Sequence, residues 1–308
     1  MAVYSDMLAE LLTTASTTDA SGPKPRDSEL DLFGLTHPGL VRRENQDHFL
    51  LGTIHQQINI HGTSLPEAQR LPLRSERLGT IMLVADGVGG GTAGGDASRI
   101  AAEAIARYVS STMNCYHTRG RQAEQSFYEA LKTAALEAHD TVRAEAASRN
   151  SGSVEVPSRS MATTLTLGLI VWPWMYVLQL GDSRCYHYFN GRLRQVTRDQ
   201  TMAQDLVDRG ALNREEAAAS PFSHVLASSI GGREARPVVS RLNISDRGCV
   251  IMLCSDGLTK HVSDEEIAAQ CARMSSCEQL CRDLLAVALE RGGSDNTTIV
   301  AGRAAVVR

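Results

Sequence analysis

The sequence predicts an α+β domain that is built around antiparallel β-sheet. Apolar runs of strand character are grouped along the chain and are followed by groups of helices, whereas a parallel sheet requires strands and helices in regular alternation. Asn190-Gly191 separates two short runs of this kind, which is the strongest short signal for a β-hairpin. The 308 residues are 43% hydrophobic and 21% charged, an ordinary globular mixture that can form a sizeable core.

The first half of the chain is expected to contain three strands and two long helices. Strand character covers residues 30–40, 47–54 and 80–86, and helical periodicity covers residues 96–113 and 121–149. Polar stretches at 55–78 and 153–160 show neither strand character nor helical periodicity, so they are expected to be loops. Residues 14–29 are rich in Ser, Thr and Pro, so we expect a flexible arm over 1–28 and a domain over 29–308.

The second half is expected to hold seven strands and four helices. The strand-like runs are residues 162–171, 174–182, 185–189, 193–197, 238–244, 249–256 and 296–307, and the helical runs are residues 201–209, 214–220, 263–273 and 277–291. Asn213 and Ser263 precede helical runs at positions that favour N-caps. The most apolar segment, residues 165–180, is broken at Pro173 and is shorter than a membrane span, so it is expected to form two strands and no span.

Charge and cysteine content exclude several classes of protein. The net charge of −4 leaves no basic field that would attract nucleic acid or an anionic membrane. The N-terminus lacks the charged and apolar regions of a secretory signal. Seven cysteines, an odd number without a C-x-x-C pair, indicate a reducing cytoplasm. Cys277 and Cys281 stand four apart, which favours core positions on a helix over a metal site.

Five aspartates stand at the ends of predicted strands. Asp47 and Asp295 precede strands, whereas Asp86, Asp182 and Asp256 end them. Taken singly, an Asp-Gly pair at a strand end is typical of a turn. The repetition favours a second interpretation, because carboxylates gathered at one edge of a sheet repel one another and a divalent cation removes that conflict.

Mg²⁺ or Mn²⁺ is the cation that these residue types favour. Hard cations take carboxylate, carbonyl and water oxygens, and Gly87 after Asp86 allows a backbone carbonyl to approach an ion without a Cβ in the way. Two such ions about 3.5–4 Å apart generate hydroxide from a shared water and stabilise a displacement at phosphorus. The Arg42-Arg43 pair shortly before Asp47 offers a guanidinium for phosphoryl oxygens. The pattern therefore predicts metal-assisted hydrolysis of a phosphate ester.

Seven short elements then occur in a characteristic order between about Asp31 and about Gly302. They are GLVRRENQD, VADGVGG, MATTLT, LGDSR, TRDQT, CSDGL and SDNTT. In these elements the chain resembles the metal-dependent protein serine/threonine phosphatases, the PPM or type 2C family, in its bacterial form. A single match of this kind would be weak evidence, but seven matches in the family's order are specific to the family.

The resemblance implies a role for each matched residue. Asp86 would bridge two metal ions, and Gly87 would offer its carbonyl to one of them. Asp256 and Asp295 would bind the other ion, and Asp47 would act through metal-bound water. Arg42 would hold the substrate phosphate, so Arg42 and Asp86 are the expected catalytic residues. Asp182 is expected to be structural.

The resemblance also implies a fold, substrates and partners. The fold would be an α-β-β-α sandwich of two packed antiparallel sheets flanked by helices, with a small helical flap at about 198–236. The substrates would be proteins that serine/threonine kinases have phosphorylated on serine or threonine. We expect a cytoplasmic monomer without nucleic-acid partners.

Three positions depart from the family pattern. Gln46 replaces a glutamate, which removes one charge from the water shell of the metals. Val88 stands where many eukaryotic members carry a histidine proposed as general acid. Ser160 replaces an acid that in bacterial relatives helps to bind a third metal together with an aspartate, here Asp256. We therefore expect two well-bound metals and a third site that is empty or fills only at high Mn²⁺.

Two alternatives compete with an active protein phosphatase. A non-catalytic regulatory or binding module on the same fold would have lost a bridging ligand, yet Asp86, Asp256 and Asp295 are all present. A phosphomonoesterase of unrelated fold acting on small molecules is disfavoured, because no D-x-D nucleophile follows an early strand.

Overall fold

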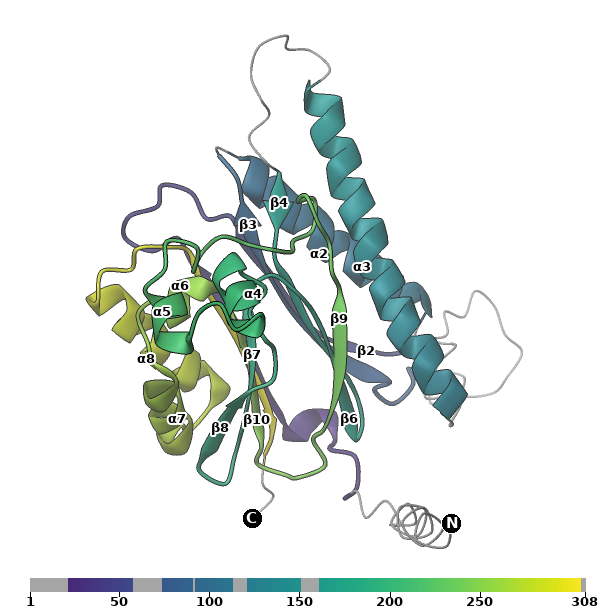
Figure 1. The fold of residues 1–308 in the computed structure, drawn as a ribbon. Helices are drawn as coiled ribbons and strands as arrows, with labels where there is room; N and C mark the ends of the chain where they lie inside the picture. The colour runs from purple at the N-terminus through teal and green to yellow at the C-terminus, as the bar shows by residue number, and fades with distance from the viewer. Residues whose placement is uncertain (1–21, 58–73, 91, 113–120, 151–160, 306–308) are drawn as a thin grey trace, which may run out of the picture.

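Two antiparallel β-sheets pack face to face in the structure, a computed structural model that describes residues 22–57, 74–90, 92–112, 121–150 and 161–305 (Figure 1). The first sheet has the order β1 (Leu30–His37), β11 (Thr297–Ala304), β10 (Val250–Cys254), β7 (Arg184–Phe189) and β8 (Arg192–Gln195). The second has the order β2 (Asp47–Ile54), β3 (Gly79–Val88), β5 (Leu165–Val171), β6 (Trp174–Leu180) and β9 (Val238–Asn243), and β4 (Ala162–Thr163) pairs with the end of β3.

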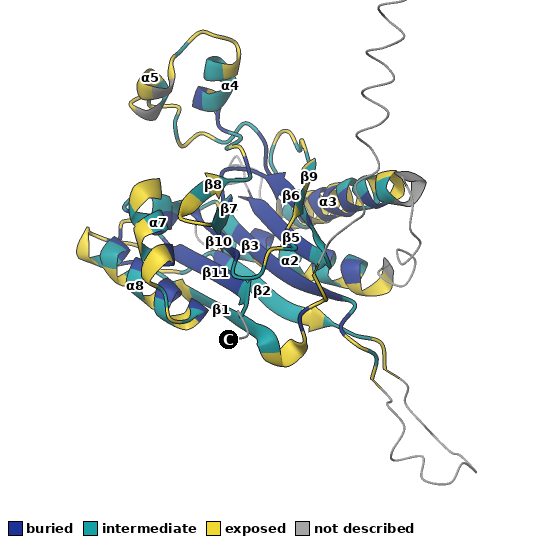
Figure 2. Cartoon of the chain, turned by 90° about the horizontal axis from the view of Figure 1, so that it is seen from below, coloured by how far each residue is buried: buried dark blue, intermediate teal, exposed yellow. Residues whose placement is uncertain are grey.

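Helices cover the outer face of each sheet (Figures 1 and 2). The second sheet carries α2 (Ala93–Thr112) and α3 (Arg121–Asn150), and the first carries α7 (Asp264–Arg273) and α8 (Cys277–Glu290). Between β8 and β9 the chain leaves the sandwich to form α4 (Met202–Asp208) and α5 (Arg214–Ala218), which stand off from the body in Figure 2. The predicted α+β sandwich of two antiparallel sheets flanked by helices is confirmed. Among the described residues, no helix has the length and apolar character needed to cross a membrane.

The core consists of three apolar layers, and β3 shows why the sequence produces them. Met82 and Val84 point into the layer between the sheets, whereas Leu83 and Ala85 point into the layer beneath α2 and α3. Successive side chains of a strand face opposite sides, so a strand buried on both sides must be continuously apolar. A third layer lies between the first sheet and α7 and α8, and Cys277 and Cys281 are buried in it as core residues.

Local signals placed most element boundaries within a few residues. The Asn190-Gly191 turn joins β7 to β8, with positive φ at both residues. Asn213 and Ser263 cap α5 and α7, each in a capping box with the glutamate three residues on. The single strand expected over 162–171 is divided at Thr164, whose backbone N–H donates to Asp86 O at 2.9 Å.

Two predictions about the fold need correction. The short helix α6 (Asp256–Thr259) begins where the preceding strand was expected to end, so Asp256 lies in its first turn. Residues 22–28 are not a loose arm: Pro25 is buried, and 27–29 form the 3₁₀ helix η1 (Asp27–Glu29). Residues 1–21, and most of the loops expected at 55–78 and 153–160, lie outside the described residues.

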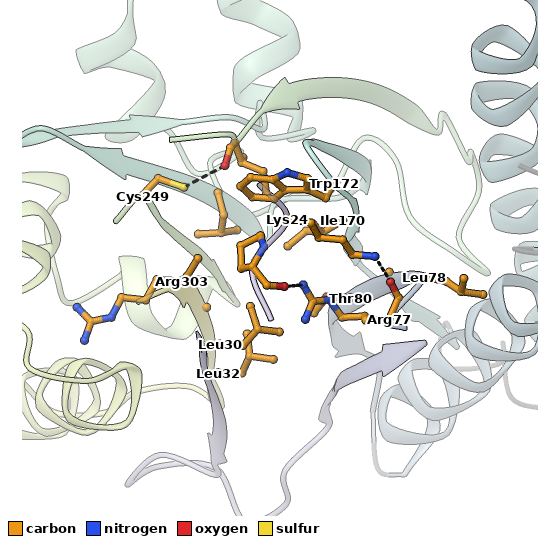
Figure 3. A pocket seen from close by; sticks show the side chains of 16 residues that line it. Lys24, Leu30, Leu32, Arg77, Leu78, Thr80, Ile170, Trp172, Cys249 and Arg303 are labelled. Carbon is orange, nitrogen blue, oxygen red and sulfur yellow. Dashed lines mark hydrogen bonds between the residues drawn. The ribbon is translucent and has the colours of Figure 1, made fainter. Parts of the chain in front are cut away.

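Residues 22–28 cover one end of the space between the sheets (Figure 3). The guanidinium of buried Arg77 donates to Pro25 O at 2.7 Å, and Lys24 Nζ donates to Arg77 O. Trp172 Nε1 donates to Gly22 O at 3.1 Å. Beneath these contacts lies a cavity of about 50 Å³. The segment therefore closes the sandwich at the end where β3 begins.

Candidate metal centre

The five aspartates at strand ends lie at one edge of the sandwich, where β3 ends. Asp47 and Asp86 are register partners on neighbouring strands β2 and β3. Asp256 and Asp295 approach from the first sheet, at the end of β10 and the start of β11. A cleft of about 880 Å³ opens at this edge, and its lining includes Asp86, Asp182, Asp256 and Asp295.

Asp47 lies beneath the cleft floor, with 3% of its surface exposed. Its Oδ2 accepts hydrogen bonds from Ser255 Oγ and Thr298 Oγ1, both at 2.7 Å. Its buried Oδ1 has no hydrogen-bond partner within the described part of the chain. Burial, aided by the charge of Asp256, raises the pKa of Asp47 to about 6. A buried carboxylate oxygen without a partner is costly, and a bound water or cation is the usual explanation.

Asp86 is the central carboxylate of the group. Burial raises its pKa well above the ordinary value, and the charges of Asp47 and Asp256 raise it further. Its backbone is held by the neighbouring strand, because Asp86 N donates to Thr164 Oγ1 at 2.9 Å and Thr163 Oγ1 donates to Asp86 O at 2.8 Å. These bonds hold the end of β3 in place.

Gly87 permits a close approach of three backbone segments. A Cβ at this position would lie 2.3 Å from Gly94 O and 2.6 Å from Gln46 O, so no other residue fits without a shift. The start of α2 and the segment before β2 therefore pack directly against the carboxylate-bearing turn. This close packing explains the glycine after Asp86 independently of any ligand.

Two cations neutralise the carboxylates contributed by the first sheet. The Arg42 guanidinium contacts both carboxylate oxygens of Asp295. Its Nε lies 2.8 Å from Oδ1, and a terminal nitrogen donates to Oδ2 at 3.0 Å. Lys260 Nζ lies 2.6 Å from Asp256 Oδ2 and 2.7 Å from Asp295 Oδ2. Burial raises the pKa of Asp295, but Arg42 and Lys260 outweigh it and hold the value below the ordinary range.

Asp182 lines both the cleft and a neighbouring groove of about 700 Å³ that runs beneath α4. Burial first, and then the charges of Asp256 and Asp199, raise its pKa to about 8. Asp182 lies in the turn between β6 and β7, directly after Gly181, whose φ is +97°. Its position beside Asp256 makes it part of the same electrostatic group.

The donor chemistry fits a hard divalent cation. Three of the acids have pKa values raised by burial and by one another, which is the repulsion that a cation relieves. The unpartnered Asp47 Oδ1 adds an oxygen without a donor. In the described ranges, however, no three carboxylate, histidine or cysteine side chains already surround one point. The side chain of Lys260 stands between two of the oxygens instead.

The structure brings all six predicted site residues together, although Arg42 is bound to Asp295 and not free. Among the three departures from the family pattern, Gln46 and Val88 line the cleft, and Ser160 lies outside the described residues. Sequence reasoning missed four further residues, whose contacts appear only in the folded chain. They are Ser255 and Thr298 beneath Asp47, Lys260 between two carboxylates, and His224 in the cleft lining.

Comparison with known proteins agrees with this geometry. Residues 72–291 match the family described as protein phosphatase 2C. The chain is 30% identical over 220 residues to the serine/threonine protein phosphatase PstP of Mycobacterium tuberculosis, covering 71% of this chain and 39% of PstP. The chain thus spans well under half of that relative's length.

Solved structures extend the likeness over most of the chain. A crystal structure of the Mycobacterium tuberculosis serine/threonine phosphatase PstP/Ppp has a TM-score of 0.69 at 26% identity, covering 90% of this chain and 99% of that one. The catalytic domain of PstP in complex with two manganese ions has a TM-score of 0.63 at 26% identity, covering 90% and 99%. This chain therefore belongs to the protein phosphatase 2C family.

Proposed function

We propose that this protein is a metal-dependent protein serine/threonine phosphatase. Its substrates would be proteins carrying phosphoserine or phosphothreonine, the products of serine/threonine kinases. The observation that carries the proposal is the gathering of Asp86, Asp256 and Asp295 at one cleft, with Asp47 buried next to Asp86 and one of its oxygens lacking a partner in the described chain. Membership of the protein phosphatase 2C family supports the same reaction class.

The residues divide between metal binding and substrate binding. Asp86 and the Gly87 carbonyl would hold two Mg²⁺ or Mn²⁺ ions from the second sheet, with Asp47 behind them. Asp256 and Asp295 would complete the site from the first sheet. When bound, such ions supply a nucleophilic water at neutral pH and neutralise charge at phosphorus. Manganese is supported by the PstP structure that contains two manganese ions.

Arg42 would orient the substrate phosphate. Its side chain is 57% exposed at the cleft, and its guanidinium already binds a carboxylate with two parallel contacts. The planar guanidinium can bind two oxygens of a phosphoryl group in the same bidentate way. The helical excursion at about 198–236, which contributes His224 and Val225 to the cleft lining, would act as a flap beside the substrate.

We propose a reducing compartment because the sequence has seven cysteines, an odd number, and no C-x-x-C pair. Six cysteines of the described residues are buried, and burial raises the pKa of each thiol, which lowers its reactivity. We therefore propose that the protein works in the cytoplasm.

Metal dependence tests the proposal directly. The purified protein should hydrolyse p-nitrophenyl phosphate and a phosphothreonine peptide when Mn²⁺ is present, and EDTA should abolish both activities. Asp86→Asn should remove nearly all turnover, while Asp140→Asn, an exposed change on α3, should leave it intact. Full turnover in EDTA without added metal would overturn the proposal.

A further inference from the structure

We propose that Lys260 is a built-in competitor for the metal, whose ammonium must leave before the Asp256–Asp295 end of the site is filled. The proposal rests on the metal site assigned above. It concerns the order and strength of metal binding and not the identity of the reaction.

Lys260 reaches these carboxylates because it is the C-cap of α6. It stands one helical turn after Asp256, and residues four apart on a helix lie on the same face. Its side chain is 23% exposed, and its ammonium lies 2.6 Å from Asp256 Oδ2 and 2.7 Å from Asp295 Oδ2. One lysine therefore bridges the two aspartates that are expected to share a metal ion.

The Oδ2 atom of Asp295 has no lone pair left to offer. Its Oδ2 accepts hydrogen bonds from Arg42 and from Lys260, and its Oδ1 accepts one from the backbone N–H of Asn296 at 3.0 Å and forms an ion pair with Arg42 Nε at 2.8 Å. A carboxylate oxygen has two lone pairs, so both acceptor positions of Oδ2 are taken and one of Oδ1 is taken. One donor must withdraw before Asp295 Oδ2 can bind a cation. Removal of Lys260 frees Asp256 Oδ2 in the same movement.

At the Asp47–Asp86 end of the site, a metal ion can bind without displacing a lysine. Asp47 Oδ1 has no partner in the described chain, and no lysine or arginine of the described residues makes an ion pair with Asp47 or Asp86. A cation entering there relieves repulsion and displaces no ammonium. The two halves of the site should consequently differ in affinity, with the Asp256–Asp295 half weaker because of Lys260.

Metal titration of the full-length chain, stripped with chelator, tests this difference. Isothermal titration with Mn²⁺ should show a tighter and a weaker event in the wild type. Lys260→Met should tighten the weaker event by about tenfold, the equivalent of two partly exposed ion pairs, and should leave the tighter event within about twofold. Lys260→Arg, which keeps the charge, should bind like the wild type.

A lysine distant from the site provides the matched control. Lys132 on α3 pairs only with Glu129 among the described residues, so Lys132→Met removes the same charge from the molecule and should change neither event. Thermal unfolding provides a second measurement. Without metal, the Tm of Lys260→Met should be lower than that of the wild type. Saturating Mn²⁺ should raise the Tm of Lys260→Met by more than it raises the Tm of the wild type.

The outcomes separate this inference from the proposed function. Equal or weaker Mn²⁺ binding by Lys260→Met, with normal binding by the wild type, would overturn the competitor role while leaving the metal site intact. Absence of Mn²⁺ binding in the wild type would overturn the proposed function itself. If Lys260→Met is insoluble, Lys260→Gln offers the same removal of charge in a polar side chain.

Discussion

The cleft concentrates negative charge on side chains that have few counter-ions. Asp86, Asp182, Asp256 and Asp295 line it, and Asp47 lies beneath. Only two nearby cations, Arg42 and Lys260, make ion pairs with these carboxylates among the described residues. Burial first, and this remaining charge second, raise the pKa values of Asp47, Asp86 and Asp182.

Arg42 and Arg43 offer a matched pair for testing phosphate recognition. Both are exposed and both line the cleft, but only Arg42 has an ion pair to Asp295 in the described chain. Arg42→Ala should raise KM for p-nitrophenyl phosphate by roughly 10- to 150-fold, the loss of a charge-assisted contact of about 1.5–3 kcal/mol. Arg43→Ala should change KM little. Steady-state kinetics at saturating Mn²⁺ would reveal a misassignment if the two effects were reversed.

Stability of the metal-free protein should depend on pH through Asp182. Burial raises its pKa from 3.8 to about 8, so between these values the folded chain binds a proton that the unfolded chain releases. The stabilising contribution is therefore complete below about pH 4 and is lost as pH rises through 8. Asp182→Asn, a neutral mimic of the protonated acid, should raise Tm in EDTA at pH 8 and have a much smaller effect at pH 5.

Asp140→Asn controls for the charge removed in that comparison, because Asp140 is exposed on α3. Its effect on Tm should be small at both pH values. Calorimetry in EDTA would refute the buried-acid account if Asp182→Asn lowered Tm at pH 8.

At the scale of the element, the end of β3 determines the geometry of the site. The strand pairs with β2 on one side and with β5 and then β4 on the other, and the division at Thr164 allows the chain to bond Asp86 from that side. Three backbone segments meet at Gly87 as a result. The position of Asp86 is therefore held by backbone contacts and by the hydroxyl groups of Thr163 and Thr164.

Gly87 and Gly52 provide a matched test of this close approach. A Cβ at Gly87 would fall 2.3 Å from backbone, whereas at Gly52 on β2 the nearest atom would be a side-chain carbon at 3.7 Å. Gly87→Ala should destabilise the protein by about 1–3 kcal/mol through overpacking and should weaken Mn²⁺ binding. Gly52→Ala should do neither. Denaturant unfolding and metal titration check both, and equal behaviour of the two variants would contradict the packing account.

At the scale of the whole molecule, the sandwich has two different ends. The strand ends near Asp86 leave an open, charged cleft, whereas the opposite end of β3 is closed by residues 22–28 over an apolar cavity. Buried Arg77 anchors that closure, because its donors are satisfied by Pro25 O and by Asp27. The closure is thus a structural feature that is separate from the site.

Two truncated chains isolate this closure. A chain that starts at residue 29 should be less stable than one that starts at residue 22, by on the order of 1–3 kcal/mol, because buried Arg77 loses its partners. Both chains should keep Mn²⁺-dependent turnover, since the cleft lies at the other end. Thermal unfolding and turnover assays measure the difference, and equal stability would indicate that residues 22–28 contribute nothing.

The sequence by itself determined what depends on near neighbours along the chain. Short apolar runs predicted the strands, Asn190-Gly191 predicted the hairpin, and Asn213 and Ser263 predicted helix starts, because each signal acts over a few residues. The aspartates at strand ends could be recognised as candidate site residues for the same reason, since an acid next to an apolar run is a local pattern. Their order along the chain was enough for the resemblance to a family.

Only the tertiary structure decided which groups meet. Asp47 is bound by Thr298, 251 residues further along the chain, and Arg42 by Asp295, 253 residues away. Such contacts follow from the strand order β1-β11-β10 in one sheet and β2-β3 in the other, which no local signal specifies. Lys260 is the clearest case: its spacing from Asp256 was visible, but its bridge to Asp295 exists because β11 pairs beside β10 and brings the second carboxylate within reach.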